Sequence, residues 1–585
     1  MRYGLISPLL GLKLDVPGIM LAEAFTPDNN NVRLVDGEIR RAKGPAAEIY
    51  DAGGRTMAVP RRIFDIASLS AKTFSVAGDQ TSYFSQGDTI RINGSSDNDG
   101  LFTVTGAVYD STNTNISVEE DIYTVNADGQ VWQGRARVLH MHQLVTAAAG
   151  LEYFFVFTAH HILRWLVASR TFIVEWEVAA SEGCQGWSTA NFNDHVFATN
   201  NSDAPLVWLS SAPGSHFQEL TAAAGYVDKA RFVTEFENTL VFGCITEGAV
   251  VYAQRARWCD WGDHAAWASG DAGYADTAGN DGISGGFAAS KGTLYCLKER
   301  SIVALWLVVS DDVFNMAVVS TTIGCRAPNS VVVDGQGAVL FYGTDRALRD
   351  LQTGVISEAV QRILREVPPD MLNDMRGAYI EELDEVWWAL PYGSGSGENN
   401  RVLKYRKGTW NNSNFEVGAF GRFNRQAAMV WEDLPYASWE DWAWDTWESV
   451  EGAKGYPVDL AADYNGHVRA LNASHTLDGE YFASHFVLES DLTEKEQLTR
   501  NKRLYHLQTY WRPWPVVIQA VIELKRDGEA EWQPVATIDI SGRGEYAVVD
   551  TPCDFRGKHF AIRISCERPF GFVGLVADFT PAGMR

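Results

Sequence analysis

The stretch "KGTLYCLKERSIVALWLVVS", Lys291 to Ser310, decides the fold class of this chain. It holds a turn followed by a strand, and then an apolar run of ten residues that begins at Ser301. A membrane-spanning helix needs roughly 20 such residues, so the run is predicted to be a buried strand. Similar runs, rich in Val, Phe, Tyr, Trp and Thr between Gly, Asn and Asp turns, recur along the chain, as in "ENTLVFGC" and "GQGAVLFYGTD". Because helix-period patterns are almost absent, the sequence predicts an all-β protein.

The turn-then-strand units recur at a spacing that favours a β-propeller of six to eight blades. From the first unit to the last there are 315 residues in seven steps, a mean of 45. A recurrence near this length, each unit a small antiparallel sheet, is typical of propeller blades. The steps vary from 39 to 54 residues, so a large sandwich of meanders stays an alternative. The first apolar residues of the units are Tyr153, Val196, Leu240, Leu294, Val339 and Val386, with weaker members at Met429 and Val468.

The regions outside this recurrence predict two further β-domains. Residues 68–121 hold several short strands with polar turns, which indicates a small inserted β-domain. Residues 476–585 contain strand pairs joined by turns such as Asp527-Gly528, as in a β-sandwich. We therefore expect an N-terminal segment that starts the propeller (1–67), the insertion, the propeller itself (122–475) and the sandwich. One packing helix is predicted to begin at Ser357.

Composition and charge exclude several classes of protein. The net charge of −25 would repel a polyanion over most of the surface, so tight wrapping of DNA is excluded. Residues 1–62 hold nine Lys or Arg against seven Asp or Glu, so an acidic partner is expected to meet the N-terminal part. The seven scattered cysteines form no C-x-x-C pair, which argues against disulfides and zinc. No signal peptide or membrane anchor is recognised, and we expect a chain made and kept in the cytoplasm.

Motifs for catalysis or cofactor binding are present by letter but lack their context. "GISGG", Gly282 to Gly286, matches the nucleophile elbow, yet its flanks indicate a Gly/Asp loop rather than a strand and a helix. "GSGSG", Gly393 to Gly397, lacks the strand and helix of a dinucleotide site. His140 with His142, and His160 with His161, have no accompanying carboxylates or cysteines, so structural histidines are expected. The sequence therefore predicts no catalytic residue, cofactor or metal, and a protein that is not an enzyme.

A tryptophan-rich segment, "WEDLPYASWEDWAWDTWESVEG" from Trp431 to Gly452, raises the question of a binding site. Seven carboxylates and no Lys or Arg lie among its indoles. Binders of single-stranded nucleic acid combine aromatic side chains with a positive groove, so base stacking is excluded. Sugar binding stays open, but we favour indoles that cover a long connection or a subunit interface. The predicted structural or interface aromatics are Trp431, Trp439, Trp442, Trp444 and Trp447, together with Trp258 and Trp261.

Several segments in a coherent order resemble one family, the propeller-bearing tail nozzle proteins of short-tailed bacteriophages, which are related to the packaged-DNA stabilisation proteins. The resemblance spans roughly residues 25 to 475, while the insertion and the C-terminal region match more weakly. The segments are "NNNVRLVDGEIRRAKGPA" (Asn29 to Ala46), "VVYAQRARWCDWGDHAAW" (Val250 to Trp267), "GTLYCLKERSIVAL" (Gly292 to Leu305), "TIGCRAPNSVVV" (Thr322 to Val333) and "NNRVLKYRKGTW" (Asn399 to Trp410).

The resemblance implies a structural protein of the virion tail, assembled in the cytoplasm of the host bacterium. Six copies would form a ring below the portal and adaptor proteins, extend the DNA exit channel, retain the packaged genome and support tail fibres. Double-stranded DNA would pass through without sequence-specific contacts. Six copies carry 6 × −25 = −150 formal charges, and an acid-lined channel would keep DNA from adhering to its wall.

Two groups of charged residues follow as site hypotheses. The basic residues Arg40, Arg41, Lys43, Arg61 and Arg62 are predicted to dock onto an acidic adaptor surface, with ordinary solvated charges as the alternative. The Gly/Asp loop from Gly262 to Gly286 is predicted to be a mobile projection that narrows the channel. Its acidic members are Asp263, Asp271, Asp276 and Asp281.

Two other readings remain beside the nozzle. The first is a receptor-binding propeller of the tail that uses Trp431 to Trp447 on a host polysaccharide. The second, less favoured, is an enzyme acting on cell-wall sugar, for which carboxylates are plentiful but no pair can be singled out. Arg255, Arg257, Trp258 and Asp260 are predicted to form a stack and ion pair inside one blade rather than a binding site.

Overall fold

The computed structural model confirms an all-β protein. The only helices in its described part are short: α1 (Gln361–Arg365) and the 3-10 turns η2 (Thr81–Tyr83), η3 (Thr221–Ala223), η4 (Pro328–Ser330), η5 (Glu358–Val360), η6 (Pro369–Asp374) and η7 (Glu381–Leu383). None of these has the length and hydropathy that crossing a membrane requires. The structure describes residues 2–6, 12–13, 26–35, 38–47, 57–122, 126–147, 151–167, 169–180, 183–211, 216–308, 313–393, 397–424, 457–474, 476–477, 480–481, 483–490, 501–512, 517–527, 529–541 and 546–581.

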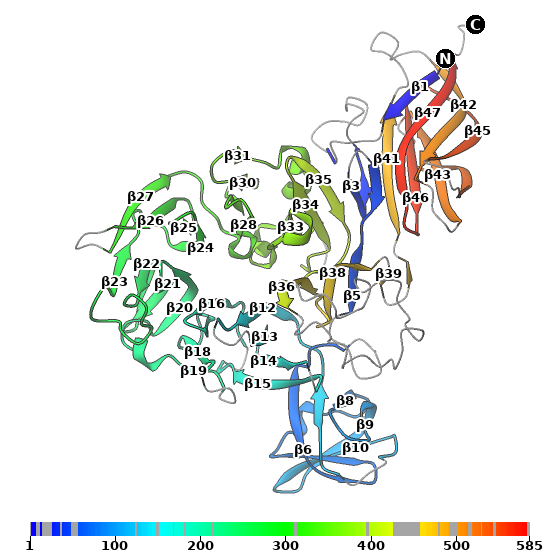
Figure 1. The fold of residues 1–585 in the computed structure, drawn as a ribbon. Coiled ribbons are helices and arrows are strands. Elements are labelled where there is room, and N and C mark those ends of the chain that lie inside the picture. Colours follow the sequence, from blue (N-terminus) through cyan, green and yellow to red (C-terminus); the bar gives the residue numbers. More distant parts are fainter. Residues whose placement is uncertain are drawn as a thin grey trace, which may run out of the picture.

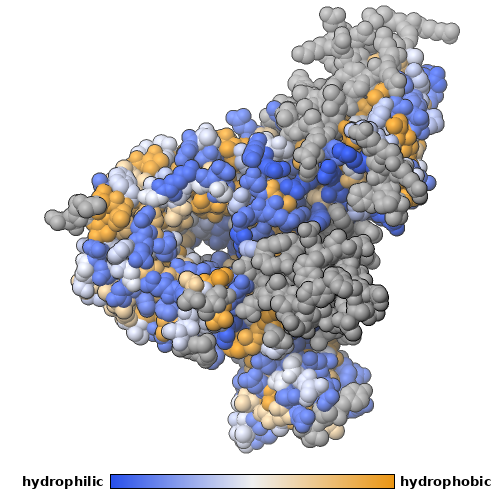
Figure 2. Space-filling model, in the orientation of Figure 1, coloured by the Kyte–Doolittle hydropathy of each residue, from blue (hydrophilic) through white to orange (hydrophobic). Residues whose placement is uncertain are grey.

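Seven four-stranded antiparallel sheets follow one another within the described residues. Figure 1 shows them arranged around a central opening, which is also visible in the space-filling view of Figure 2. We call this arrangement the ring. The first three sheets are β12 (Val138–Val145), β13 (Glu152–Thr158), β14 (His161–Leu166) and β15 (Thr171–Glu177); β16 (Ser188–Phe192), β17 (His195–Thr199), β18 (Leu206–Leu209) and β19 (Gln218–Glu219); and β20 (Lys229–Phe236), β21 (Thr239–Glu247), β22 (Val250–Trp258) and β23 (Gly273–Asp276).

The remaining ring sheets run in the same order, except that the last one takes a strand from the start of the chain. That strand is β5, which pairs with β38 and so closes the ring. These sheets are β24 (Ile283–Ser290), β25 (Thr293–Lys298), β26 (Ile302–Leu307) and β27 (Phe314–Ser320); β28 (Val332–Val333), β29 (Val339–Tyr342), β30 (Leu348–Asp350) and β31 (Gly354–Val355); β32 (Arg376–Ile380), β33 (Glu385–Leu390), β34 (Arg401–Arg406) and β35 (Thr409–Ser413); and β36 (Ala419–Asn424), β37 (Pro457–Ala462), β38 (Val468–Ser474) and β5 (Gly44–Ala47).

Most of the residues that were aligned from the sequence recurrence fall at equivalent positions in successive sheets. Six of the aligned residues lie in the second strand of six successive sheets: Tyr153 in β13, Val196 in β17, Leu240 in β21, Leu294 in β25, Val339 in β29 and Val386 in β33. Val468 begins the third strand of the seventh sheet, and Met429 lies outside the described residues. The repeated unit is therefore one sheet.

The stretch "KGTLYCLKERSIVALWL", which begins at Lys291, forms β25 and β26, and both faces of these strands are buried. Leu294 and Cys296 pack with residues of the third sheet, such as Trp258. Leu297 and Ile302 pack with residues of the fifth sheet. Because each ring sheet is covered on both faces by its neighbours, its inner strands are apolar at consecutive positions rather than alternating.

The insertion is a closed barrel with its own core, and it is wider than the predicted residues 68–121. Its first and last strands pair with each other, so that Arg62 lies opposite Gln133. The barrel contains β6 (Arg62–Ser70), β7 (Thr73–Ala77), β8 (Thr89–Asn93), β9 (Gly100–Tyr109), β10 (Asn113–Val118) and β11 (Gln130–Gln133), in the order β10-β7-β6-β11-β8-β9.

The C-terminal region forms two packed sheets that also contain strands from residues 1–67, the part predicted to be an N-terminal segment and the start of the propeller. One sheet has the order β3-β4-β47-β42-β45, with β1 on β47, and the other β2-β41-β46-β43-β44. The strands are β1 (Arg2–Ile6), β2 (Asn29–Asn30), β3 (Val32–Val35), β4 (Glu38–Arg41), β41 (Ser484–Ser490), β42 (Lys502–Trp511), β43 (Ile518–Arg526), β44 (Gln533–Ile540), β45 (Ala547–Gly557), β46 (Phe560–Cys566) and β47 (Gly571–Pro581); β39 (Thr476–Leu477) and β40 (Glu480–Tyr481) form a separate hairpin.

Two of these N-terminal strands, β2 and β3, also contact the sixth ring sheet and so connect it to the sandwich. Arg33 forms an ion pair with Glu385 at 2.7 Å, and the guanidinium also donates to the carbonyl of Leu383. The amide of Asn29 donates to Asn411 at 3.3 Å. Residues 29–41 therefore bridge two bodies before the chain continues to β5 and closes the ring.

Candidate functional site

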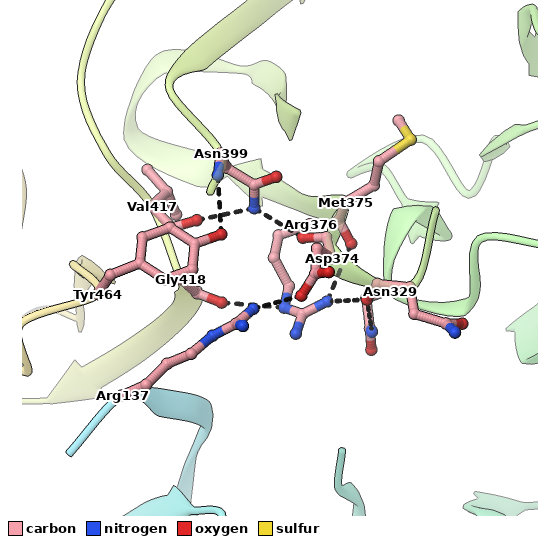
Figure 3. A network of polar contacts seen from close by, with 10 residues as sticks. Arg137, Asn329, Asp374, Met375, Arg376, Asn399, Val417, Gly418 and Tyr464 are labelled. Atoms are coloured by element: carbon pink, nitrogen blue, oxygen red, sulfur yellow. Dashed lines mark hydrogen bonds and ion pairs between the residues drawn. The ribbon is translucent and has the colours of Figure 1, made fainter. Parts of the chain in front are cut away.

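Residues that lie shortly before the first strands of several ring sheets form one network of polar contacts (Figure 3). Arg137 precedes β12, Asn329 lies in η4 before β28, and Gly418 precedes β36. All of them contact the loop 369–376, which leads into β32. We call this loop and the residues around it the mouth.

Arg376 lies at the centre of the mouth with its side chain buried. Its Nε donates to the carbonyl of Gly418 at 3.0 Å, and its Nη1 donates to the carbonyls of Met375, at 3.2 Å, and Asn373. Burial, and then the nearby charge of Arg137, lower the pKa of Arg376 to about 10, so the guanidinium stays protonated at neutral pH. A buried cation persists only when its donors are satisfied, and here backbone carbonyls of two sheets satisfy them.

Asn399 joins the sixth and seventh sheets beside Arg376. Its side-chain amide donates to the carbonyls of Asp374, at 2.6 Å, and Val417, at 2.8 Å. Its backbone N–H donates to the hydroxyl of Tyr464 at 2.8 Å. Each of these bonds connects segments that are far apart in sequence, so the mouth fixes the relative position of neighbouring sheets.

Arg137 brings the first sheet into the same network. Its guanidinium forms an ion pair with Asp374 and lies over the ring of Tyr464, 4.5 Å from the ring centroid. Both partners of the ion pair are about one-third exposed, so water reaches them from the opening. The first, sixth and seventh sheets are thus held together at one point.

A pocket of about 340 Å³ opens beside the loop 369–376. Asn373 forms part of its wall and accepts a hydrogen bond from Arg231 at 3.5 Å. Five arginines gather around the mouth (Arg137, Arg231, Arg326, Arg346 and Arg376), against the carboxylates of Glu299, Asp370 and Asp374. These residues carry more positive than negative charge, in a chain whose net charge is −25. The pocket is lined by Arg326, Tyr342, Gly343, Thr344, Arg346, Pro369, Asp370, Leu372 and Asn373.

Two histidines on β12 form a polar ladder to β16, as expected for structural histidines. Nε2 of His140 lies 2.7 Å from the hydroxyl of Thr189, which in turn lies 2.9 Å from Nδ1 of His142. Nε2 of His142 lies 2.7 Å from the side-chain oxygen of Asn191. Burial, and then the charges of His142 and Arg376, lower the pKa of His140 to about 3. Neutral imidazoles therefore join the first two sheets.

The residues predicted to dock onto an adaptor do not form one surface. Arg40, on β4 of the sandwich, pairs with Glu38 at 3.2 Å, and Arg41 is buried. Lys43, just after β4, is exposed. Arg61 and Arg62 lie at the start of the barrel, far from β4 (Figure 1), and Arg62 covers the ring of Tyr83 at 3.9 Å.

The predicted acidic channel loop is divided by a strand. Asp263 and Asp271 precede β23, whereas Asp276 ends it and Asp281 follows it. Asp276 accepts two hydrogen bonds from Arg255, at 2.7 and 2.8 Å. Asp281 pairs with the buried Lys298 at 3.1 Å. These carboxylates hold strands and turns together, and the loop is not one continuous projection.

The interactions expected inside one blade are present around Arg255. Its guanidinium lies between the rings of Tyr252 and Tyr274, 3.8 and 4.0 Å from their centroids, and pairs with Glu247. Arg257 pairs with the same Glu247 at 2.9 Å. Arg255 and Arg257 thus take part in a stack and ion pairs, but with other partners than the predicted Trp258 and Asp260.

The aromatic residues named from the sequence have different environments. Trp258 is buried, meets Phe314 edge to face at 4.9 Å, and donates its Nε1–H to the carbonyl of Asp271. Trp261 is 63% exposed. Trp431, Trp439, Trp442, Trp444 and Trp447 all lie outside the described residues.

The sequence analysis missed the mouth. Its signal was weak but present: polar residues directly precede a first strand in "QGRARVLHMH", "APNSVVV" and "LNDMRGAYI". Within the described residues, no cluster of His, Cys, Asp and Glu has the arrangement of a metal site. What the mouth offers chemically is a set of guanidinium and amide donors, which suits an anionic group.

Comparison with known proteins yields likeness in structure but none in sequence. No family model and no curated protein match the chain. A family 43 arabinoxylan arabinofuranohydrolase from Bacillus subtilis has 10% identity over 92% of this chain and 96% of its own, with a TM-score of 0.21. An exo-β-1,3-galactanase from Phanerochaete chrysosporium has 8% identity over 92% and 100%, with a TM-score of 0.18. The extracellular domain of a one-component system from B. thetaiotaomicron has 9% identity over 92% and 79%, with a TM-score of 0.34.

These matches overturn one prediction. The sequence analysis predicted, from the lack of catalytic motifs in their proper context, that the chain is not an enzyme. The structural matches contradict this prediction, because glycoside hydrolases are among the solved structures that the chain resembles. The absence of recognisable catalytic motifs was a weak basis, since function depends on a site rather than on the fold that carries it. The low identities and TM-scores assign the chain no activity or substrate.

Proposed function

We propose that this chain is the nozzle subunit of a short-tailed bacteriophage, a structural protein of the virion tail. In this proposal its seven four-stranded sheets are the blades of a seven-bladed propeller, and about six copies form a ring below the portal and adaptor. The ring of copies extends the DNA exit channel, retains the packaged genome and supports tail fibres.

The observation that carries the proposal is the course of residues 29–47. This stretch contains the family-like segment "NNNVRLVDGEIRRAKGPA". It supplies β2, β3 and β4 to the sandwich and β5 to the seventh ring sheet. Through Arg33 and Glu385 it also ties the sandwich to the sixth sheet. One segment thus makes the ring and the sandwich a single connected unit, as a subunit that must keep its shape while DNA passes would require.

The charge of the innermost strands bears on where DNA would pass. The first strands of the seven sheets carry Lys229, Arg231, Arg376 and Arg422 but only one carboxylate, Glu235. Among the described residues, these seven strands therefore form no acid-lined wall of the kind that would keep DNA sliding. We therefore place the DNA channel between copies, on the acidic outer surface that the net charge of −25 requires elsewhere.

Native mass spectrometry of the purified chain, alone and mixed with portal and adaptor proteins from the same virion, tests this function. A six-fold assembly, or recruitment in multiples of six when the complex is present, supports the nozzle. Arg33→Gln removes the ion pair with Glu385 that joins the sandwich to the ring, and it should weaken assembly if this contact is needed. Arg503→Gln, which removes a more exposed ion pair with Asp554, serves as the control. A persistent monomer or trimer that ignores the portal complex would overturn the proposal.

A further inference from the structure

The pocket at the mouth lies between two turns of the ring. One wall is the turn from Tyr342 to Arg346, which joins β29 and β30, and the other is the loop from Pro369 to Asn373. Arg326, from the connection that leads to η4, completes it. Its volume of about 340 Å³ lies within the range of small-ligand sites, roughly 300 to 1,000 Å³.

Arg346 offers the pocket an unused guanidinium. Among the described residues its side chain has no hydrogen-bond or ion-pair partner, since the adjacent Asp345 is engaged by Arg349 at 2.7 Å. Its backbone has a φ of 63°, a left-handed conformation that is uncommon for a residue with a side chain. This conformation belongs to the turn itself, in which the N–H of Arg346 donates to the carbonyl of Gly343 at 3.0 Å.

Two neutral donors accompany this guanidinium. Thr344 accepts the N–H of Gly324 at 3.4 Å, which leaves its hydroxyl hydrogen to donate. The side-chain oxygen of Asn373 accepts from Arg231 at 3.5 Å, which directs its amide N–H groups elsewhere. Both residues line the pocket.

Arg326 forms an exposed ion pair with Glu299. Its guanidinium lies 2.6 Å from Glu299, and the two side chains are 47% and 43% exposed. Exposed ion pairs contribute little to stability, so a bound anion can share this guanidinium. One carboxylate, Asp370, also lines the pocket and opposes anion binding.

From these contacts we propose that the pocket binds a phosphoryl group, held by Arg326 and Arg346 with Thr344 and Asn373 as neutral donors. Guanidinium forks match phosphate oxygens in geometry and charge. The group can come from a small phosphorylated molecule or from a nucleic-acid backbone. The inference concerns one chain and does not depend on the nozzle function.

Isothermal titration of the full-length chain with inorganic phosphate, against chloride at equal ionic strength, tests the site. Arg346→Gln should weaken phosphate binding about tenfold or more, because a hydrogen bond to a charged group is lost. Asp370→Asn should strengthen it. Arg349→Gln, on the following strand β30 and paired with Asp345, should leave it unchanged.

The results separate cleanly. Phosphate binding that Arg346→Gln weakens and Arg349→Gln does not supports the site, whereas no binding, or equal binding by both variants, overturns it. Titration with dAMP and with a short DNA duplex distinguishes the sources: preference for dAMP indicates a small ligand, and preference for the duplex indicates backbone phosphate. Because native mass spectrometry measures assembly separately, the pocket and the nozzle can fail independently.

Discussion

The ring and the inserted barrel are both built from short antiparallel strands, but they are stabilised differently. In the ring, the buried Arg376 reaches the carbonyl of Gly418 in the next sheet, and hydrophobic clusters combine residues of neighbouring sheets. The barrel closes on itself around Phe74 and other residues of its own strands. A ring sheet therefore depends on its neighbours, while the barrel depends on its own closure, and the following changes test this difference.

The largest effect is expected inside the barrel. Phe74 is fully buried and meets Phe102 edge to face at 5.0 Å. Phe74→Ala should destabilise the barrel by about 3–5 kcal/mol through lost burial and a cavity, without moving the unfolding of the ring. Hydrogen exchange by mass spectrometry would show this as lost protection confined to residues 62–133. Val108→Ala, at a position that is 66% exposed, is the control, and loss of protection across the ring would contradict the comparison.

A change at Arg376 should instead affect several ring sheets at once. Arg376→Met keeps much of the volume but leaves buried carbonyls of Gly418 and Met375 without donors. We expect about 3 kcal/mol of destabilisation, visible by denaturant titration and as faster exchange in the first, sixth and seventh sheets. Arg349→Gln removes an ion pair with Asp345 in which the side chains are 22% and 32% exposed, and it should cost less than about 1 kcal/mol. Equal effects of both variants would mean that the mouth does not join the sheets.

Acid should weaken the ring through His140. Its pKa is about 3 in the folded chain against an ordinary 6.5, so at pH 5 the unfolded chain takes up a proton that the folded chain does not. The free energy of unfolding should therefore fall between pH 7 and pH 5 by about 1–2 kcal/mol from this group. His140→Gln can still bond Thr189 and should reduce that fall, whereas Val108→Ala, at an exposed position of the barrel, should leave it unchanged. An unchanged pH dependence in both would contradict the buried, neutral state.

The smallest effect is expected when the barrel is removed. Ile63 and Trp132 pack with residues of the ring and are paired strand neighbours, roughly 5 Å apart between Cα atoms. A short Gly-Ser linker can therefore replace residues 64–131 and leave these two contacts in place. The free energy of unfolding of the ring should change by no more than a surface substitution would change it, roughly 0.5 kcal/mol. Calorimetry should show one transition fewer. A large drop in the ring transition would show that the barrel supports it.

The sequence alone determined the fold class and the repeated unit. Tyr153, Leu240 and Leu294 each fall in the second strand of a sheet, because turn residues and apolar runs act over a few positions and leave a local record. The short helix after Ser357 was also predictable, since Val360, Ile363 and Leu364 are the buried positions of η5 and α1.

Only the tertiary structure decided which strands pair and which polar residues meet. That β5 closes the seventh sheet, that Arg33 reaches Glu385 across 352 residues of chain, and that Arg137 meets Asp374 all depend on long-range contacts. Backbone hydrogen bonds between strands carry no sequence code of their own, so partners are selected by burial of whole faces. The arginines of the mouth come from five separate places in the chain, and only the closure of the ring brings them together.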